Sequence, residues 1–170
     1  MGELFHTPLI LLDAGAREWR CGFSDEDGPA VILPGPSAGG GFPAWKEKLS
    51  NAIEALEAEP PEQAVVLSEW PGTSTGAREA MANALFTDHG AAALWTVAGP
   101  LLALFNSGRD TAVLVDVGER ATHILLVYDG HDVLEIGAAV HPLAGGHLPH
   151  PNASCHSDAD RRGLQPRTRR

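Results

Sequence analysis

Two short segments of the chain each place an aspartate two residues before a glycine, directly after an apolar run. Carboxylates at strand ends can hold the hydration shell of Mg²⁺, and the backbone N–H groups of a glycine turn can bind phosphate oxygens. Two such hairpins that face each other would hold the phosphates of a nucleotide from both sides. The segments are Leu11-Leu12-Asp13-x-Gly15-x-Arg17-x-x-Arg20 and, 103 residues later, Leu114-Val115-Asp116-x-Gly118-x-Arg120-x-x-His123.

The repeat also has an ordinary interpretation. Aspartate and glycine are common turn residues, so a single segment of this kind is usually a plain β-hairpin. A matched pair, with apolar runs before both members and basic residues after both, is harder to explain in this way. The sequence pattern favours a phosphate-binding pair and leaves two plain hairpins as the alternative.

The segments around these hairpins predict a mixed α/β architecture, a twisted sheet with flanking helices. Apolar residues keep helical spacing from Trp45 to Leu56, with charges on the opposite side. Short apolar runs bounded by Gly and Pro predict strands. We expect strands at residues 9–12, 19–23, 30–33, 64–67, 111–115 and 121–128, helices at 45–56, 78–87 and 94–105 (the last deeply packed), and loops at 34–43 and 71–76.

Composition narrows the classes of partner and location. The 170 residues carry a formal net charge of −10, which disfavours nucleic acids and anionic membranes as partners. Two cysteines make no disulfide framework, and no apolar run approaches membrane-spanning length, so we expect a soluble cytosolic or nuclear protein and assign it to the cytoplasm. Residues 149–170 are polar and Arg-rich, and we expect a disordered tail there. The histidines near the C-terminus match no zinc-finger spacing, so no metal site is predicted.

Several blocks along residues 9–148 resemble the actin family, in the right order and with nearly constant spacing inside each block. Each block alone is weak, and their collinearity is the strong signal. The resemblance implies a ribonuclease H-like half-fold over residues 1–148 that corresponds to the large inner subdomain of one actin half. The blocks are Leu12-Asp13-Ala14-Gly15, Arg20-Cys21-Gly22-Phe23, Val65-Val66-Leu67-Ser68-Glu69, Ser107-Gly108-Arg109-Asp110-Thr111, Val115-Asp116-Val117-Gly118-Glu119 and Leu143-Ala144-Gly145-Gly146.

The departures from the family pattern matter as much. The outer subdomain and the second half of the fold are expected to be missing. Ala16 stands where the family has a phosphate-binding serine, and Arg20 where it has a lysine that reaches the phosphates. The glutamine that orients the attacking water corresponds to Gly99. Arg17 and Arg120 are additional cations, which either contact phosphate or are plain turn residues or partners of nearby carboxylates.

These departures lead to three hypotheses. The first is a non-catalytic structural or interaction protein of the cytoskeleton, with actin or actin-related proteins as partners. The second is a weak binder of ATP and Mg²⁺ through a degenerate site, and the third is a truncated product without independent activity. Hydrolysis needs preorganised donors and a positioned water, so we expect no enzymatic activity. The residues of the degenerate site are Asp13, Gly15, Arg20, Asp116, Gly118, Glu119 and His123.

Overall fold

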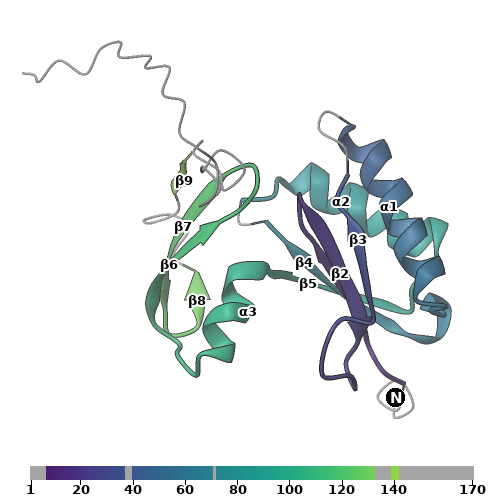
Figure 1. The fold of residues 1–170 in the computed structure, drawn as a ribbon, viewed down its shortest axis with the longest axis horizontal. Helices are drawn as coiled ribbons and strands as arrows, with labels where there is room; N and C mark the ends of the chain where they lie inside the picture. Colours follow the sequence, from purple (N-terminus) through teal and green to yellow (C-terminus); the bar gives the residue numbers. More distant parts are fainter. Residues whose placement is uncertain (1–6, 37–39, 71, 133–138, 142–170) are drawn as a thin grey trace, which may run out of the picture.

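The computed structural model describes residues 7–36, 40–70, 72–132 and 139–141. It contains two β-sheets, with helices α1 and α2 beside the first sheet and helix α3 beside the second (Figure 1). The mixed α/β class predicted from the sequence is confirmed. The strands are β1 Ile10–Ala14, β2 Glu18–Phe23, β3 Val31–Pro34, β4 Ala64–Glu69, β5 Ala93–Ala98, β6 Ala112–Val117, β7 Thr122–Tyr128, β8 His131–Asp132 and β9 Ala139–His141.

The first sheet has the strand order β3-β2-β1-β4-β5. Strands β1, β2 and β3 pair antiparallel, whereas β4 runs parallel to both β1 and β5. Parallel pairing requires a crossover connection, which α1 provides between β3 and β4 and α2 provides between β4 and β5. The helices are α1 Gly41–Ala55, α2 Thr75–Asn83 and α3 Gly99–Asn106, with a 3₁₀ turn at Pro60–Glu62 and a π turn at Ala84–Asp88.

The main core lies between α1, the π turn and one face of the first sheet. The apolar stripe predicted for α1 is confirmed, because Leu49, Ala52 and Ile53 are all buried. Their contacts with the sheet remove most apolar side chains of this layer from water, which is the main favourable contribution to folding. The other buried members are Ile10, Leu12, Trp19, Cys21, Leu56, Val65, Leu67, Ala84, Leu85 and Ala91.

The connection between β3 and α1 is short. It consists of residues 35–40, since β3 ends at Pro34 and α1 begins at Gly41. The sequence predicted a loop up to residue 43, so the helix begins earlier than expected. Likewise α2 begins at Thr75, inside the loop predicted for residues 71–76, with the Ser74 hydroxyl accepting from the Ala77 backbone N–H as a helix cap.

The helix predicted for residues 94–105 is wrong. The segment forms β5 first, which pairs with β4 along its whole length, and then α3. Pro100 lies in the first turn of α3, where its missing N–H is harmless, and this position marks the start of the helix. The segment is also not deeply packed: Leu104 is buried, but Trp95 remains 63 % exposed and Phe105 49 % exposed.

The second sheet pairs β6 with β7 and β7 with both β8 and β9. Helix α3 packs against β6. The predicted tail at residues 149–170 and the Leu143–Gly146 block lie outside the described residues. Within the described ranges, no helix is long and apolar enough to cross a membrane.

Candidate functional site

The internal repeat seen in the sequence is also a repeat of strand pairing. Asp13 lies opposite Arg20 in the first hairpin, and Asp116 lies opposite His123 in the second. Every residue pair of the β1–β2 ladder has a counterpart in the β6–β7 ladder at the same offset. The equivalent pairs are Ile10–Phe23 and Val113–Leu126, Leu11–Gly22 and Leu114–Leu125, Leu12–Cys21 and Val115–Ile124, Asp13–Arg20 and Asp116–His123, and Ala14–Trp19 and Val117–Thr122.

The two glycines occupy equivalent turns. A Cβ added at Gly15 would lie 2.6 Å from the Glu18 carbonyl oxygen, and one added at Gly118 would lie 3.1 Å from the Ala121 carbonyl oxygen. Both turns therefore bring the backbone so close together that a larger residue would strain them. The tight turn explains why glycine stands at both positions, whether or not a phosphate binds there.

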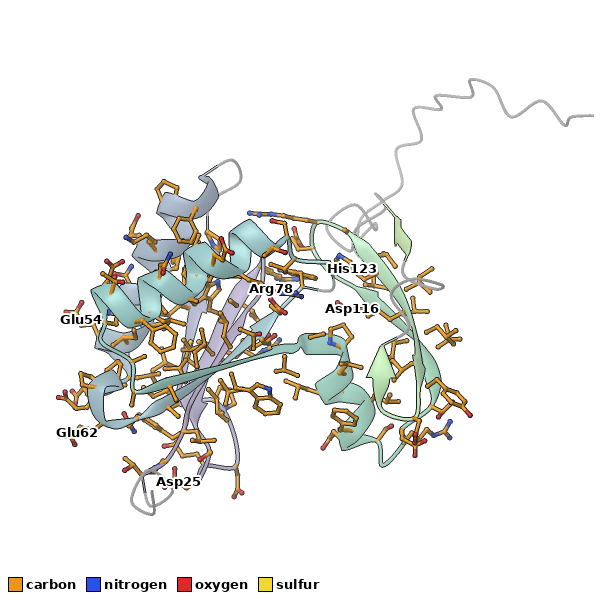
Figure 2. The ribbon with its side chains drawn as sticks, turned by 180° about the vertical axis from the view of Figure 1, so that it is seen from behind. Asp25, Glu54, Glu62, Arg78, Asp116 and His123 are labelled. Carbon is orange, nitrogen blue, oxygen red and sulfur yellow. The ribbon has the colours of Figure 1, made fainter. Side chains whose placement is uncertain are left out.

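Both hairpins open into one cleft of about 490 Å³. The carboxylates of Asp13 and Asp116 both line it, so the structure brings the two predicted aspartates to the same cavity. Asp116 lies on the second sheet, on the side that faces the first (Figure 2). Of the predicted site residues, six line this cleft, namely Asp13, Gly15, Arg20, Asp116, Gly118 and Glu119.

His123 is the predicted site residue that the structure places elsewhere. It does not line the cleft, but lies 8 % exposed beside Trp70, with 4.9 Å between the ring centroids. His123 is thus not among the residues that line this cleft, and its assignment to the phosphate site stays a prediction. As the cross-strand partner of Asp116, His123 projects from the same face of the second sheet, and its imidazole packs against the indole of Trp70.

Asp13 has several polar partners within the cleft. Its Oδ1 accepts a hydrogen bond from Ser68 Oγ at 2.9 Å, and its Oδ2 lies 3.8 Å from Arg20 Nη1. Arg20 also forms an ion pair with Glu18. Sequence reasoning did not select Ser68 or Glu18 as site residues. The signal for Ser68 was present, since a strand that runs parallel to β1 brings its own end beside Asp13.

A second ion pair, between Glu69 and Arg78, lies at the end of β4. Arg78 on α2 contacts Glu69 through Nε and Nη2, at 2.8 Å to Oε1 in both cases, and the Glu69 side chain is only 7 % exposed. This paired geometry compensates for the cost of burying the carboxylate. The pair therefore links α2 to the end of β4.

The lining of the cleft is predominantly acidic. It contains five carboxylates and two guanidinium groups, and Arg120 is not among the lining residues. Such a set suits a hydrated divalent cation but repels an unaccompanied triphosphate. In the described part of the chain, no three metal-binding side chains cluster closely enough to hold an ion directly. The carboxylates are Asp13, Glu18, Glu69, Asp116 and Glu119, and the guanidinium groups are those of Arg17 and Arg20.

Two positions of the cleft lack the side chains that the family resemblance implies for catalysis. Ala16 lines the cleft without a hydroxyl group. Gly99 also lines it, and a Cβ added there would lie 2.9 Å from Ser68 Oγ, so a larger side chain would require Ser68 to move. The residues present therefore fit the ATP and Mg²⁺ of the family only in part: both carboxylates and both turns are there, but these two groups are not.

Cys21 follows Arg20 on β2 and is 1 % exposed. Burial raises the pKa of Cys21 to about 11, and the nearby Asp13 carboxylate adds to this rise. The thiol is therefore protonated at neutral pH and is a poor nucleophile. Cys21 thus behaves as a small apolar residue of the core, as buried free cysteines commonly do.

Comparison with known proteins places these features in one family. The family model for actin matches residues 43–161. Over 80 residues the chain is 34 % identical to actin-related protein 4 of Neurospora crassa, an alignment that covers 47 % of this chain and 17 % of that relative. The chain thus spans only a small part of that relative's length. With the family model covering more than half of its residues, the chain belongs to the actin family.

Proposed function

We propose that the chain is a non-catalytic actin-related protein that acts by binding other proteins of the actin family. The observation that carries this proposal is the lining of the cleft between the two hairpins. It keeps the paired aspartates and glycine turns, but presents five carboxylates against two guanidinium groups and only a glycine at residue 99.

The physical argument concerns the transition state of phosphoryl transfer. Hydrolysis depends on cations and donors that are preorganised around the transferred phosphate, and on a side chain that orients the attacking water. Gly99 has no side chain for this task, and the guanidinium of Arg20 is already paired with Glu18 and lies near Asp13. Residue 99 therefore offers no group to orient a water, and the cation at residue 20 is already engaged by carboxylates.

An exposed apolar patch formed by β5 and α3 supports a role in binding. Trp95 on β5 is 63 % exposed, and Leu102 and Phe105 on the adjoining α3 are 42 % and 49 % exposed. Trp95 and Leu102 line the same pocket, and larger exposed apolar patches often mark interaction surfaces. We assign this patch to contacts with actin or an actin-related protein, and the place of action to the cytoplasmic cytoskeleton.

The first experiment measures binding and phosphate release together. Purified full-length chain is sedimented with actin filaments in the presence of Mg-ATP, and inorganic phosphate is measured with the chain alone. We expect co-sedimentation without phosphate release above buffer. Trp95→Ser should weaken the binding at least about tenfold, since a buried aromatic anchor dominates such interfaces. Burst or steady release of phosphate by the chain alone would overturn the proposal.

The matched control is Ile32→Ser. Ile32 is 58 % exposed and lies on β3, at the opposite edge of the same sheet. It should leave co-sedimentation unchanged. Equal losses in the two variants would show that the patch around Trp95 is not the binding surface.

A second candidate function is weak binding of Mg-ATP, favoured by the observation that Asp13 and Asp116 line one cleft. A ligand that binds only the native state raises the free energy of unfolding by about 2.7 kcal/mol at a concentration of about 100 times Kd. A melting series with Mg-ATP tests this, with Asp116→Asn as the site variant and Asp25→Asn, which lies outside the cleft, as the control. A flat melting temperature eliminates this candidate.

A further inference from the structure

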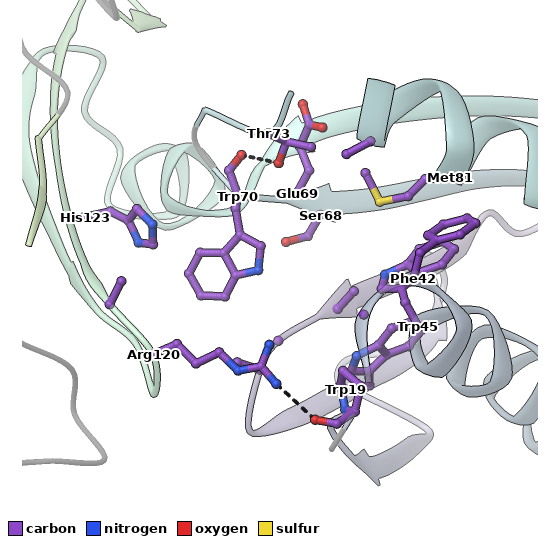
Figure 3. A pocket seen from close by; sticks show the side chains of 17 residues that line it. Trp19, Phe42, Trp45, Ser68, Glu69, Trp70, Thr73, Met81, Arg120 and His123 are labelled. Carbon is purple, nitrogen blue, oxygen red and sulfur yellow. Dashed lines mark hydrogen bonds between the residues drawn. The ribbon is translucent and has the colours of Figure 1, made fainter. Parts of the chain in front are cut away.

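A second cavity, of about 490 Å³, adjoins the cleft, and Figure 3 shows the side chains that line it. The two cavities share a wall at the ends of β1 and β4, from Ala14 to Ala16 and from Ser68 to Trp70. The size of the second cavity is within the range of small-molecule sites, roughly 300–1,000 Å³. The aromatic residues that line it are Trp19, Phe42, Trp45, Trp70 and His123.

The aromatic rings are grouped on two sides of the cavity. Trp45 lies between Trp19 and Phe42, with centroid distances of 5.6 Å and 5.5 Å, and its ring is nearly parallel to that of Phe42. Trp70 and His123 form the other group (Figure 3). Aromatic side chains bind planar apolar groups by stacked and edge-to-face contacts. The arrangement suits a flat ring system between the two groups.

Two buried nitrogens of this lining have no hydrogen-bond partner among the described residues. They are Nε1 of Trp19 and Nδ1 of His123. Trp19 is fully buried and His123 is 8 % exposed. A buried donor that makes no hydrogen bond costs about 1–3 kcal/mol. The indole N–H of Trp19 can only donate, whereas Nδ1 of His123 donates or accepts according to the tautomer, and both atoms are closed off from the cavity itself.

The other polar side chains of the lining already have partners. Ser68 Oγ donates to Asp13, Glu69 is paired with Arg78, and Thr73 Oγ1 donates to the Trp70 carbonyl oxygen at 2.7 Å. The hydroxyl donors of these side chains are therefore in use, and the charged donor in the lining is Arg120.

Arg120 adds a positive charge at the edge of the cavity. Its Nη2 donates to the Pro36 carbonyl oxygen at 3.1 Å, so the side chain extends from the turn of the second hairpin to the connection before α1 (Figure 3). A guanidinium group has five N–H donors, and this bond uses one. The remaining donors match the two oxygens of a carboxylate.

We propose that this cavity binds a small planar aromatic anion. The ring lies between the Trp70–His123 group and the Trp19–Trp45–Phe42 group, and the carboxylate pairs with Arg120. The site is separate from the phosphate cleft, because Arg120 and His123 line this cavity and do not line the cleft. The proposal does not rest on nucleotide binding, although the two cavities share the wall formed by Ala14–Ala16 and Ser68–Trp70.

The experiment titrates 2-naphthoate into the full-length ¹⁵N-labelled chain and follows the indole N–H resonances of the four tryptophans. Three of them, Trp19, Trp45 and Trp70, line the cavity, and Trp95 does not. We expect saturable shifts of the first three, with Trp95 unchanged as an internal reference. Absence of saturation, or an equal shift of Trp95, would overturn the proposal.

A matched pair of arginine variants tests the charge contact. Arg120→Leu should weaken 2-naphthoate binding about tenfold, while it leaves the affinity for the neutral 2-naphthamide nearly unchanged. Arg17→Leu is the control, because Arg17 is also an exposed turn arginine but lines only the phosphate cleft. Equal losses in both variants, or the same loss for both ligands, would contradict the assignment of Arg120. Saturating Mg-ATP should leave the naphthoate shifts in place, and competition between the two would place the ligand in the phosphate cleft instead.

Discussion

The two hairpins share one pairing ladder and differ in which face they bury. In the first hairpin, Ile10 and Leu12 on one face are 0 % and 2 % exposed. In the second, the equivalent residues Val113 and Val115 are 64 % and 60 % exposed. Burial has moved to the other face of the second hairpin, where Leu125 is 1 % exposed.

The difference lies in what packs against each hairpin. Helix α1 and the π turn cover the first hairpin from one side and complete the main core. Helix α3 packs against β6 and buries Leu104, and the valine face of the second sheet is left open to solvent. Strand pairing is thus a property of the local sequence, whereas the buried face depends on which helix is available to cover it.

The largest expected difference in stability is between side-chain truncations at equivalent positions of the two hairpins, one buried and one exposed. Leu12→Ala should lower the free energy of unfolding by about 2–5 kcal/mol, because it leaves a cavity in the core. Val115→Ala should change it by no more than about 0.5 kcal/mol, because that side chain is already in water. Urea denaturation of both variants measures the difference. Similar losses at the two positions would mean that the second sheet is covered in solution.

The next largest expected difference is in the stability lost when alanine replaces the glycine of each turn. Gly15→Ala brings a methyl group to 2.6 Å from a backbone oxygen that cannot move freely, and we expect a loss of about 2–3 kcal/mol. Gly118→Ala meets its nearest backbone oxygen at 3.1 Å, so a loss of about 1 kcal/mol is expected. Thermal melts give both values. The reverse order would show that the second turn is the tighter one.

The pH dependence of stability should separate the hairpins further. The pKa of Cys21 is raised from 9.0 to about 11 in the native state, so native protein holds this proton more tightly than unfolded protein does. The contribution is complete below about pH 9 and is lost as pH rises towards about 11, by up to about 1.4 kcal/mol per pH unit.

Cys21→Ala should remove this contribution to the pH dependence of the free energy of unfolding. It should also lower that free energy at every pH, because packing is lost. The equivalent position of the second hairpin is Ile124, which does not titrate. Ile124→Ala is therefore the control, and it should leave the slope unchanged. Denaturation at a series of pH values between 8 and 11 checks both variants, and an unaltered slope in Cys21→Ala would refute the assignment.

The smallest effect on stability is expected at the exposed valine face. Val115→Lys should alter the free energy of unfolding by less than about 0.5 kcal/mol and should reduce concentration-dependent association, since exposed apolar patches promote it. Sedimentation velocity at several concentrations measures the association. Glu119→Lys, a charge change in the neighbouring turn, is the control and should leave association as it is.

Some features of the candidate site could be predicted from the sequence, and others depend on tertiary contacts. The spacing of Asp13, Gly15, Asp116 and Gly118 was visible in the sequence, and the structure brings all four to one cleft. The position of His123 was not predictable, because it depends on Trp70 at the end of a different strand. The partners of Asp13 and the aromatic cavity likewise depend on which strand ends and helices come together.

The sequence by itself determined the α/β class, the repeated hairpins and the amphipathic face of α1, because these depend on residue spacing within short segments. It did not determine the division of residues 94–105 into β5 and α3. An apolar run of that length fits a buried helix or a strand equally well, and pairing with β4 decided the matter. Tertiary structure alone decided which face of each hairpin is buried, since a strand has two faces and only contact with other elements distinguishes them.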